Sequence, residues 1–179
     1  MLDIDAASCK TMEEAKHLAE GVVVRRSRPT TRMKLALMSL NIPTGLHDQV
    51  LERGMHDNHP SLAQYAPYAA HALTVVLFYK IALAVNLISN ERPSNRCDVA
   101  YLFYLPFYMM FVSSDRLHEK CASLFMRSDQ VFVWDPELKS VLNELNNYYL
   151  KLLDSERDKG VYSLASDLPE IRNGIVRRL

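Results

Sequence analysis

The chain has 179 residues, 49% of them hydrophobic and 23% charged, with 21 basic and 21 acidic residues. This length and composition indicate one globular domain with a sizeable core, and they exclude a disordered or fibrous chain. The formal net charge of zero provides no global field that would attract nucleic acid, although a local basic patch still can.

The N-terminal half is predicted to be nearly all helical, with helices over residues 10–21, 29–40, 43–54 and 61–88. Thr11 is expected to cap the first helix, with Glu14 three residues on completing a capping box. The stretch 61–88 is either one long helix or two, because Pro67 can be a kink or a new start.

Residues 68–88 are also long and apolar enough to suggest a membrane span. Lys80 lies near the middle of this stretch, where a lysine costs about 3 kcal/mol. This charge favours a buried helix and no membrane partner. A membrane protein stays as a further alternative, which would need Lys80 paired or facing a cavity.

The C-terminal half alternates helix, strand, helix, strand and helix, over residues 97–105, 107–114, 115–126, 130–134 and 135–156. Pro106 is expected to stop the first of these helices, and Asp135 to cap the last. Short buried strands between helices favour a parallel sheet. We predict an α/β fold with a small parallel sheet flanked by many helices, forming one domain over residues 1–158, with a tail over residues 159–179.

Two aspartates bracket the apolar run of the first predicted strand. Asp115 directly follows that strand, and Asp98 opens the preceding helix. The carboxyl ends of parallel strands line the functional crevice of such sheets, so the two carboxylates can meet there. Close carboxylates repel unless they share a cation or a proton, and Mg²⁺ or Mn²⁺ suits oxygen ligands. Alternatively, both aspartates only stabilise helix N-termini.

The segment 94–136 resembles the C-terminal half of a PIN domain, the metal-dependent ribonuclease fold of many toxin–antitoxin toxins. The resemblance lies in Asp98 opening a helix, then "MMFVSSD" with Ser113 and Asp115, then His118 and "QVFVWDP". It implies a Mg²⁺-dependent endoribonuclease in which Asp98 and Asp115 bind metal. RNA and a protein inhibitor are the partners it implies.

PIN domains begin with a hydrophobic strand that ends in a further aspartate. Asp5 is the third acid that the resemblance suggests, as a metal ligand, and Glu52 the fourth catalytic acid. Only Met1 and Leu2 precede Asp3, so that strand is too short here or lies outside the chain. This departure supports the alternative of a catalytically degenerate PIN-like interaction or scaffold protein. A second copy of the chain, in a homo-oligomer, also stays open as a partner.

Substrate contacts are assigned to Ser113, His118, Arg92 and Arg96, which lie near the expected crevice. Alternatively, His118 orients a carboxylate, and the two arginines only offset the charge of nearby carboxylates. The basic segment 25–32 is either a solvated loop or a phosphate-binding patch. The aromatic residues of segment 101–111 are expected to pack in the core rather than to stack on bases. Three widely spaced cysteines form no CxxC pair, so a reducing cytoplasm is the expected compartment.

Overall fold

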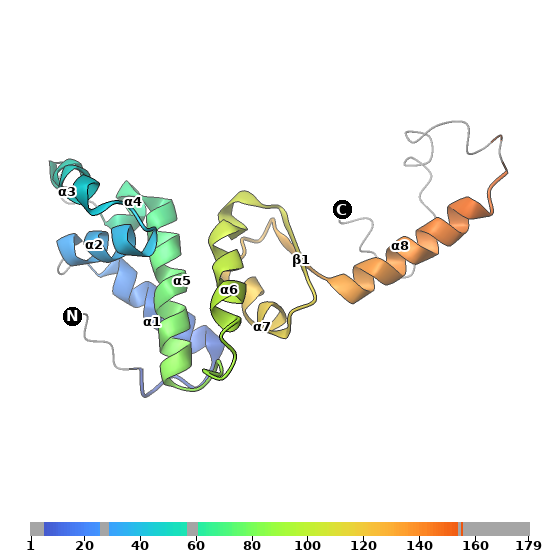
Figure 1. The fold of residues 1–179 in the computed structure, drawn as a ribbon, viewed down its shortest axis with the longest axis horizontal. Helices are drawn as coiled ribbons and strands as arrows, with labels where there is room; N and C mark the ends of the chain where they lie inside the picture. Colours follow the sequence, from blue (N-terminus) through green and yellow to red (C-terminus); the bar gives the residue numbers. More distant parts are fainter. Residues whose placement is uncertain (1–5, 26–28, 57–60, 154, 156–179) are drawn as a thin grey trace.

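The computed structural model describes residues 6–25, 29–56, 61–153 and 155 (Figure 1). In chain order, its elements are α1 (Met12–Val24), α2 (Pro29–Ser39), the 3₁₀ helix η1 (Thr44–Leu46), α3 (His47–His56), α4 (Leu62–Tyr65), α5 (Pro67–Ala84), α6 (Asn95–Ala100), the 3₁₀ helix η2 (Tyr101–Phe107), β1 (Met110–Ser113), α7 (Arg116–Phe125), β2 (Val131–Trp134) and α8 (Asp135–Leu150). The predicted boundary at residue 158 and the tail beyond it lie outside the described residues.

The first helix begins as predicted. The Thr11 side chain accepts a hydrogen bond from the Glu14 backbone N–H, and the Glu14 carboxylate accepts one from the Thr11 N–H, both at 3.2 Å. The helix then continues through Gly21 to Val24. It extends beyond the predicted end because Val22 and Val23 belong to the buried core, and burial outweighs the local preference of glycine for a helix end.

Two helices, rather than one, form the stretch after Ser61. The first ends at Tyr65 and the second begins at Pro67. Proline has no backbone N–H and disfavours helical geometry at the residue before it, so Ala66 breaks the run. Pro67 itself fits the first turn of α5, where its missing donor would have no partner in any case.

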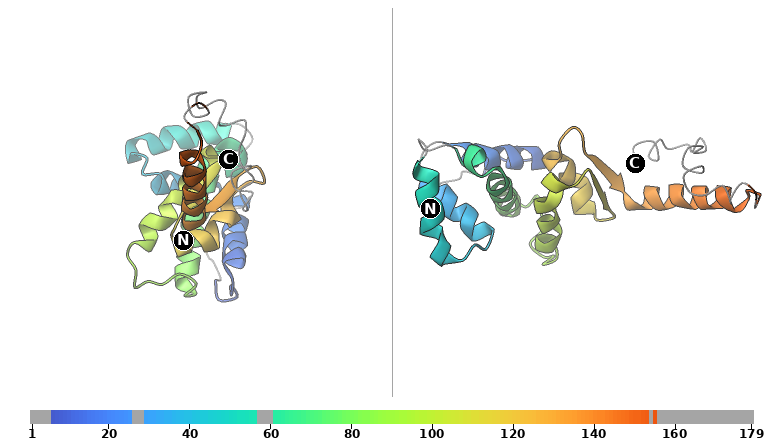
Figure 2. Two further views of the ribbon diagram at one scale, coloured as in Figure 1. Left: turned by 90° about the vertical axis from the view of Figure 1, so that its right-hand side faces the viewer. Right: turned by 90° about the horizontal axis from the view of Figure 1, so that it is seen from above.

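Helix α5 is the centre of the fold. It lies between the group formed by α1 to α4 and the group formed by α6, η2, the sheet and α7 (Figures 1 and 2). Its buried residues include the consecutive run 72–75, so the helix is covered on several sides, as an apolar helix in a core must be. His71 joins α5 to η2, because its Nε2–H donates to the Leu102 carbonyl over 2.9 Å.

By length and composition, α5 is also long and apolar enough to cross a membrane, with half of its 18-residue window buried inside the protein. Lys80 is exposed on the surface of the folded chain. Lys80, whose charge disfavours a membrane span, therefore lies on the surface and not among the core helices.

Strands β1 and β2 form a parallel two-stranded sheet, and α7 connects them. Met110 pairs with Val131 and Ser113 pairs with Trp134, so the carboxyl ends of the strands lie in register. The prediction of an α/β fold with a small parallel sheet and many helices is confirmed at this level. The strands have four residues each, fewer than predicted for the first.

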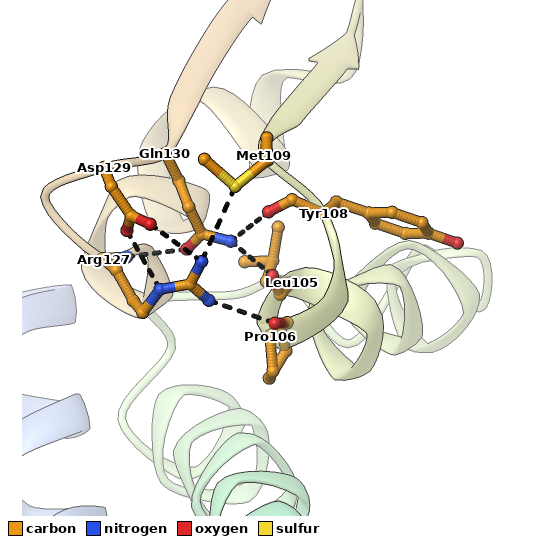
Figure 3. Close-up of polar contacts among 7 residues, drawn as sticks. All are labelled: Leu105, Pro106, Tyr108, Met109, Arg127, Asp129 and Gln130. Carbon is orange, nitrogen blue, oxygen red and sulfur yellow. Dashed lines mark hydrogen bonds and ion pairs between the residues drawn. The ribbon is translucent and has the colours of Figure 1, made fainter.

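Pro106 does not stop the helix, contrary to the prediction. The chain passes at Tyr101 from α6 into η2, which continues to Phe107 with Pro106 inside it. The carboxyl end of η2 is held by side chains from the turn before β2 (Figure 3). Arg127 donates to the Pro106 carbonyl over 3.0 Å, and the Gln130 amide donates to the carbonyls of Leu105 and Tyr108. These bonds satisfy carbonyls that the end of a helix leaves open.

Helix α8 projects away from the other elements in Figure 1 and in the right-hand view of Figure 2. It starts at Asp135, with Trp134 in the capping position, one residue earlier than predicted. The start is shifted because β2 leads directly into the helix. The pairing of Trp134 with Ser113 therefore fixes where α8 begins.

The central position of α5 predicts a difference between two Phe→Ala substitutions. Phe78 is fully buried, and its ring packs edge-on against Phe125 at 5.1 Å. We expect Phe78→Ala to lower the free energy of unfolding by about 3–5 kcal/mol in urea denaturation. Phe107→Ala, at a ring that is 65% exposed, should cost under about 1 kcal/mol. Similar losses for both substitutions would contradict this packing.

Candidate functional site

An open pocket of about 480 Å³ lies at the carboxyl ends of β1 and β2. Its lining combines three aspartates with hydroxyl, imidazole and aromatic groups: Asp98, Tyr101, Phe111, Val112, Ser113, Ser114, Asp115, His118 and Asp135. The two aspartates singled out in the sequence thus meet at one pocket. They come from α6 and from the turn between β1 and α7.

Asp115 caps α7 and lines the pocket at the same time. Its Oδ1 accepts a 2.6 Å hydrogen bond from the Leu117 N–H, and its own N–H donates to Ser113 Oγ over 3.0 Å. The helix-cap interpretation of this residue is therefore correct for one carboxylate oxygen. A cap holds the carboxylate in one position, which suits a ligand as well as a structural group.

His118, on α7, connects this helix to two of the other segments that line the pocket, α6 and β1. It is 4% exposed, and its Nε2 lies 2.7 Å from the backbone oxygen of Asp98. Because a carbonyl can only accept, Nε2 carries the proton. In the neutral ring, Nδ1 then accepts from the Ser113 hydroxyl, also over 2.7 Å. Both nitrogens are engaged, so His118 positions α6 and β1 relative to each other.

Substrate contact by Ser113 and His118 stays a prediction, and these contacts give both residues a positioning role as well. The Ser113 oxygen already bonds the His118 ring and the Asp115 N–H. The imidazole also packs edge-on between the rings of Tyr101 and Phe111, at 5.7 and 5.0 Å. Their action on a ligand would therefore pass through the placement of Asp98 and Asp115.

Asp135 is the third carboxylate of the pocket, and its position before Pro136 predicts only a helix cap. It immediately follows β2, just as Asp115 follows β1. The rule that selected Asp115, an acid at the carboxyl end of a buried strand, applies equally to Asp135. Its Oδ2 forms an ion pair with Lys139, one helical turn away, and lies 2.7 Å from the Lys139 Nζ.

The pocket fits a hard divalent cation by its donor chemistry. Its three aspartates offer carboxylate oxygens as ligands. In proteins, Mg²⁺ commonly keeps several waters and binds one or two carboxylates. Within the described part of the chain, however, no three His, Cys, Asp or Glu side chains are already arranged around one metal position. The pocket therefore offers oxygen ligands without a preformed set of three.

A softer metal fits this region less well. Asp115, His118 and Cys121 lie at helical spacing, but both nitrogens of His118 are engaged. Cys121 is fully buried, and burial, helped by the nearby negative charge of Asp115, raises the pKa of its thiol to about 12. The thiol therefore stays protonated at neutral pH, whereas metals are bound by the thiolate.

The other two predicted acids are not brought to the pocket. Glu52 is exposed on α3, which packs against α2 and η1 at the end of the molecule opposite to β1 (Figure 1). The helical order of the N-terminal half, with α5 between α3 and the sheet, accounts for this separation. Asp5 lies outside the described residues.

Residues 26–28 of the basic segment lie outside the described residues, and the other arginines predicted to meet phosphate differ in burial. Arg92 and Arg96 are exposed just before and within α6, and neither forms an ion pair with a described residue. Arg32, from the basic segment, is instead 3% exposed and donates to the Val22 carbonyl over 2.6 Å. Burial, together with the positive charge of Arg25, lowers its pKa. Arg32 is therefore a core residue rather than a phosphate contact.

The expectation that the aromatic segment packs in the core is correct for only part of it. Phe103 and Phe111 pack against the core. Tyr101, Tyr104, Phe107 and Tyr108 are each more than half exposed. The sheet has two short strands, which leaves too little covering structure for every ring of this run.

No protein-family model, curated protein or solved structure matches this chain.

The bonds of Ser113 predict an effect on stability that its neighbour Ser114 should not share. Ser113→Ala removes the partner of His118 Nδ1 and of the Asp115 N–H, so we expect the free energy of unfolding to fall by about 1–3 kcal/mol. Ser114 is exposed, and Ser114→Ala should stay within about 0.5 kcal/mol of wild type. Urea denaturation of both variants tests this, and equal stabilities would rule out the described bonds.

Proposed function

We propose that the chain is a PIN-like endoribonuclease that hydrolyses phosphodiester bonds with Mg²⁺ or Mn²⁺ bound at the pocket. The observation that supports this is the gathering of Asp98, Asp115 and Asp135 around one pocket at the carboxyl ends of two parallel strands. The order of Asp98, Ser113, Asp115 and His118 in the sequence resembles PIN domains and selects RNA as the substrate class.

Asp98, Asp115 and Asp135 are the residues that would hold the cation, with Asp135 in the place first assigned to Asp5. A bound Mg²⁺ supplies a water of lowered pKa and neutralises charge on the phosphate. The protein contributes position. The Leu117 N–H fixes one oxygen of Asp115, and His118 fixes the backbone of Asp98.

Phosphate recognition is assigned to the exposed guanidinium groups of Arg92 and Arg96. Both lie at the amino end of the helix that carries Asp98. An arginine without a carboxylate partner can neutralise a phosphate of the RNA backbone and release its counterion. A cation is needed only in the pocket itself, where three carboxylates alone would repel the phosphate that is cleaved.

The second candidate is a catalytically degenerate PIN-like scaffold protein. The observation in its favour is that the described residues contain no three ligands already arranged for one metal ion. In that case Asp115 acts only as the N-cap of α7 and Asp135 as a first-turn acid of α8, and the pocket keeps its shape through the Ser113–His118 bond.

Calorimetric titration with Mn²⁺ separates these two functions. We expect wild type to bind Mn²⁺, and Asp98→Asn/Asp115→Asn to bind at least about tenfold more weakly. Asparagine is as good a helix cap as aspartate, so the substitution at Asp115 removes the charge while keeping the cap of α7. Asp135→Asn should also weaken binding and, like the double variant, should slow Mg²⁺-dependent cleavage of a single-stranded RNA.

Asp48→Asn is the matched control, because Asp48 is an exposed acid in the first turn of α3, far from the pocket. It should bind Mn²⁺ as wild type does. A folded wild type that binds no Mn²⁺ and cleaves no RNA would refute the nuclease proposal and leave the scaffold function.

A further inference from the structure

A row of exposed aromatic rings leads away from the pocket along η2. The row, here called the aromatic ridge, consists of Tyr101, Tyr104 and Phe107, which are 57%, 51% and 65% exposed. Each follows the last by three residues, and a 3₁₀ helix has three residues per turn. The three side chains therefore leave the helix on the same face.

The aromatic ridge is continuous with the pocket. Tyr101 lines the pocket together with Asp98, and its ring packs edge-on against His118. At the other end, the ring of Phe107 packs against Tyr68 of α5 with 5.1 Å between centroids. A ligand lying along the ridge would thus reach the three aspartates at one end.

The backbone under the ridge is fixed by long-range hydrogen bonds. His71 bonds the Leu102 carbonyl, and Arg127 and Gln130 bond the carbonyls of Leu105, Pro106 and Tyr108 (Figure 3). In the same view the ring of Tyr108 points away from this polar cluster. The exposed rings are therefore presented by a rigid support, which reduces the entropy lost on binding.

Two exposed arginines precede the ridge on the same helical segment and favour an anionic polymer as its ligand. Arg92 and Arg96 stand exposed at the amino end of α6, which runs directly into η2, and neither pairs with a described acid. Exposed rings and unpaired arginines on one surface segment are the combination used to bind single strands, in which bases stack on aromatic side chains and phosphates meet cations.

We propose that the aromatic ridge binds the bases of single-stranded RNA and leads the strand into the pocket. The inference rests on the proposed function for the identity of the polymer. A rise of about 2 Å per residue separates successive ring positions by about 6 Å. Stacked bases in a duplex are about 3.4 Å apart, so the ridge suits an unstacked, extended strand and not a duplex.

Fluorescence anisotropy of a labelled 12-nucleotide single-stranded RNA, measured in EDTA to prevent metal-dependent cleavage, tests the proposal. We expect Tyr104→Ala and Phe107→Ala each to weaken binding by roughly 5- to 100-fold. Tyr104→Phe keeps the ring and should bind nearly as wild type does. Tyr148→Ala, at a 40% exposed tyrosine on α8, is the control and should leave affinity unchanged.

Equal affinity of wild type and the two alanine variants overturns the proposal, as does equal binding of a duplex of the same length. It is also overturned if wild type binds no RNA and sedimentation shows a dimer that Tyr104→Ala and Phe107→Ala dissociate, because the ridge is then a protein contact. Ring-dependent binding without Mg²⁺-dependent cleavage would support the ridge and refute the nuclease. Cleavage that requires Asp115, with ridge variants binding as wild type does, would refute the ridge alone.

Discussion

The two hydrogen bonds of the buried His118 side chain hold the pocket together. One nitrogen bonds the Asp98 carbonyl on α6, and the other bonds Ser113 at the end of β1, each over 2.7 Å. Ser113 in turn accepts from the N–H of Asp115. A single imidazole thereby sets the distance between the helix that carries one carboxylate and the turn that carries the next. The His118 ring also packs against Tyr101, the first residue of η2, so the pocket and the aromatic ridge have one common support.

Local sequence signals predicted much of the fold because the interactions behind them are local. The Thr11–Glu14 capping box lies within one helical turn, and Pro67 separates α4 from α5 through its own backbone chemistry. The alternation of short apolar runs and helices predicted the parallel pair of strands. Asp115 could be selected as a pocket residue because it follows a strand, and strand ends meet at one edge of a parallel sheet.

Features that depend on tertiary neighbours could not be read from the sequence. Phe103 and Tyr104 are adjacent in the same apolar run, yet one packs on the core and the other is 51% exposed. Arg32 looked like part of a basic surface and is buried against the Val22 carbonyl. Asp135 is a different case, since the strand-end rule would have found it. Because Pro136 directly follows Asp135, the sequence pattern there is also typical of a helix start and indicates a cap.

The central claim is that the carboxyl ends of β1 and β2 form one cation site. Amide NMR spectra recorded with substoichiometric Mn²⁺ test it most directly, because the paramagnetic ion broadens the signals of nearby nuclei. The account predicts selective broadening of the amides of Asp98, of residues 113–117 and of Asp135, with α3 signals unchanged. Broadening centred elsewhere, or none at Mn²⁺ concentrations that saturate any binding, would show that these aspartates serve their helices and not a metal ion.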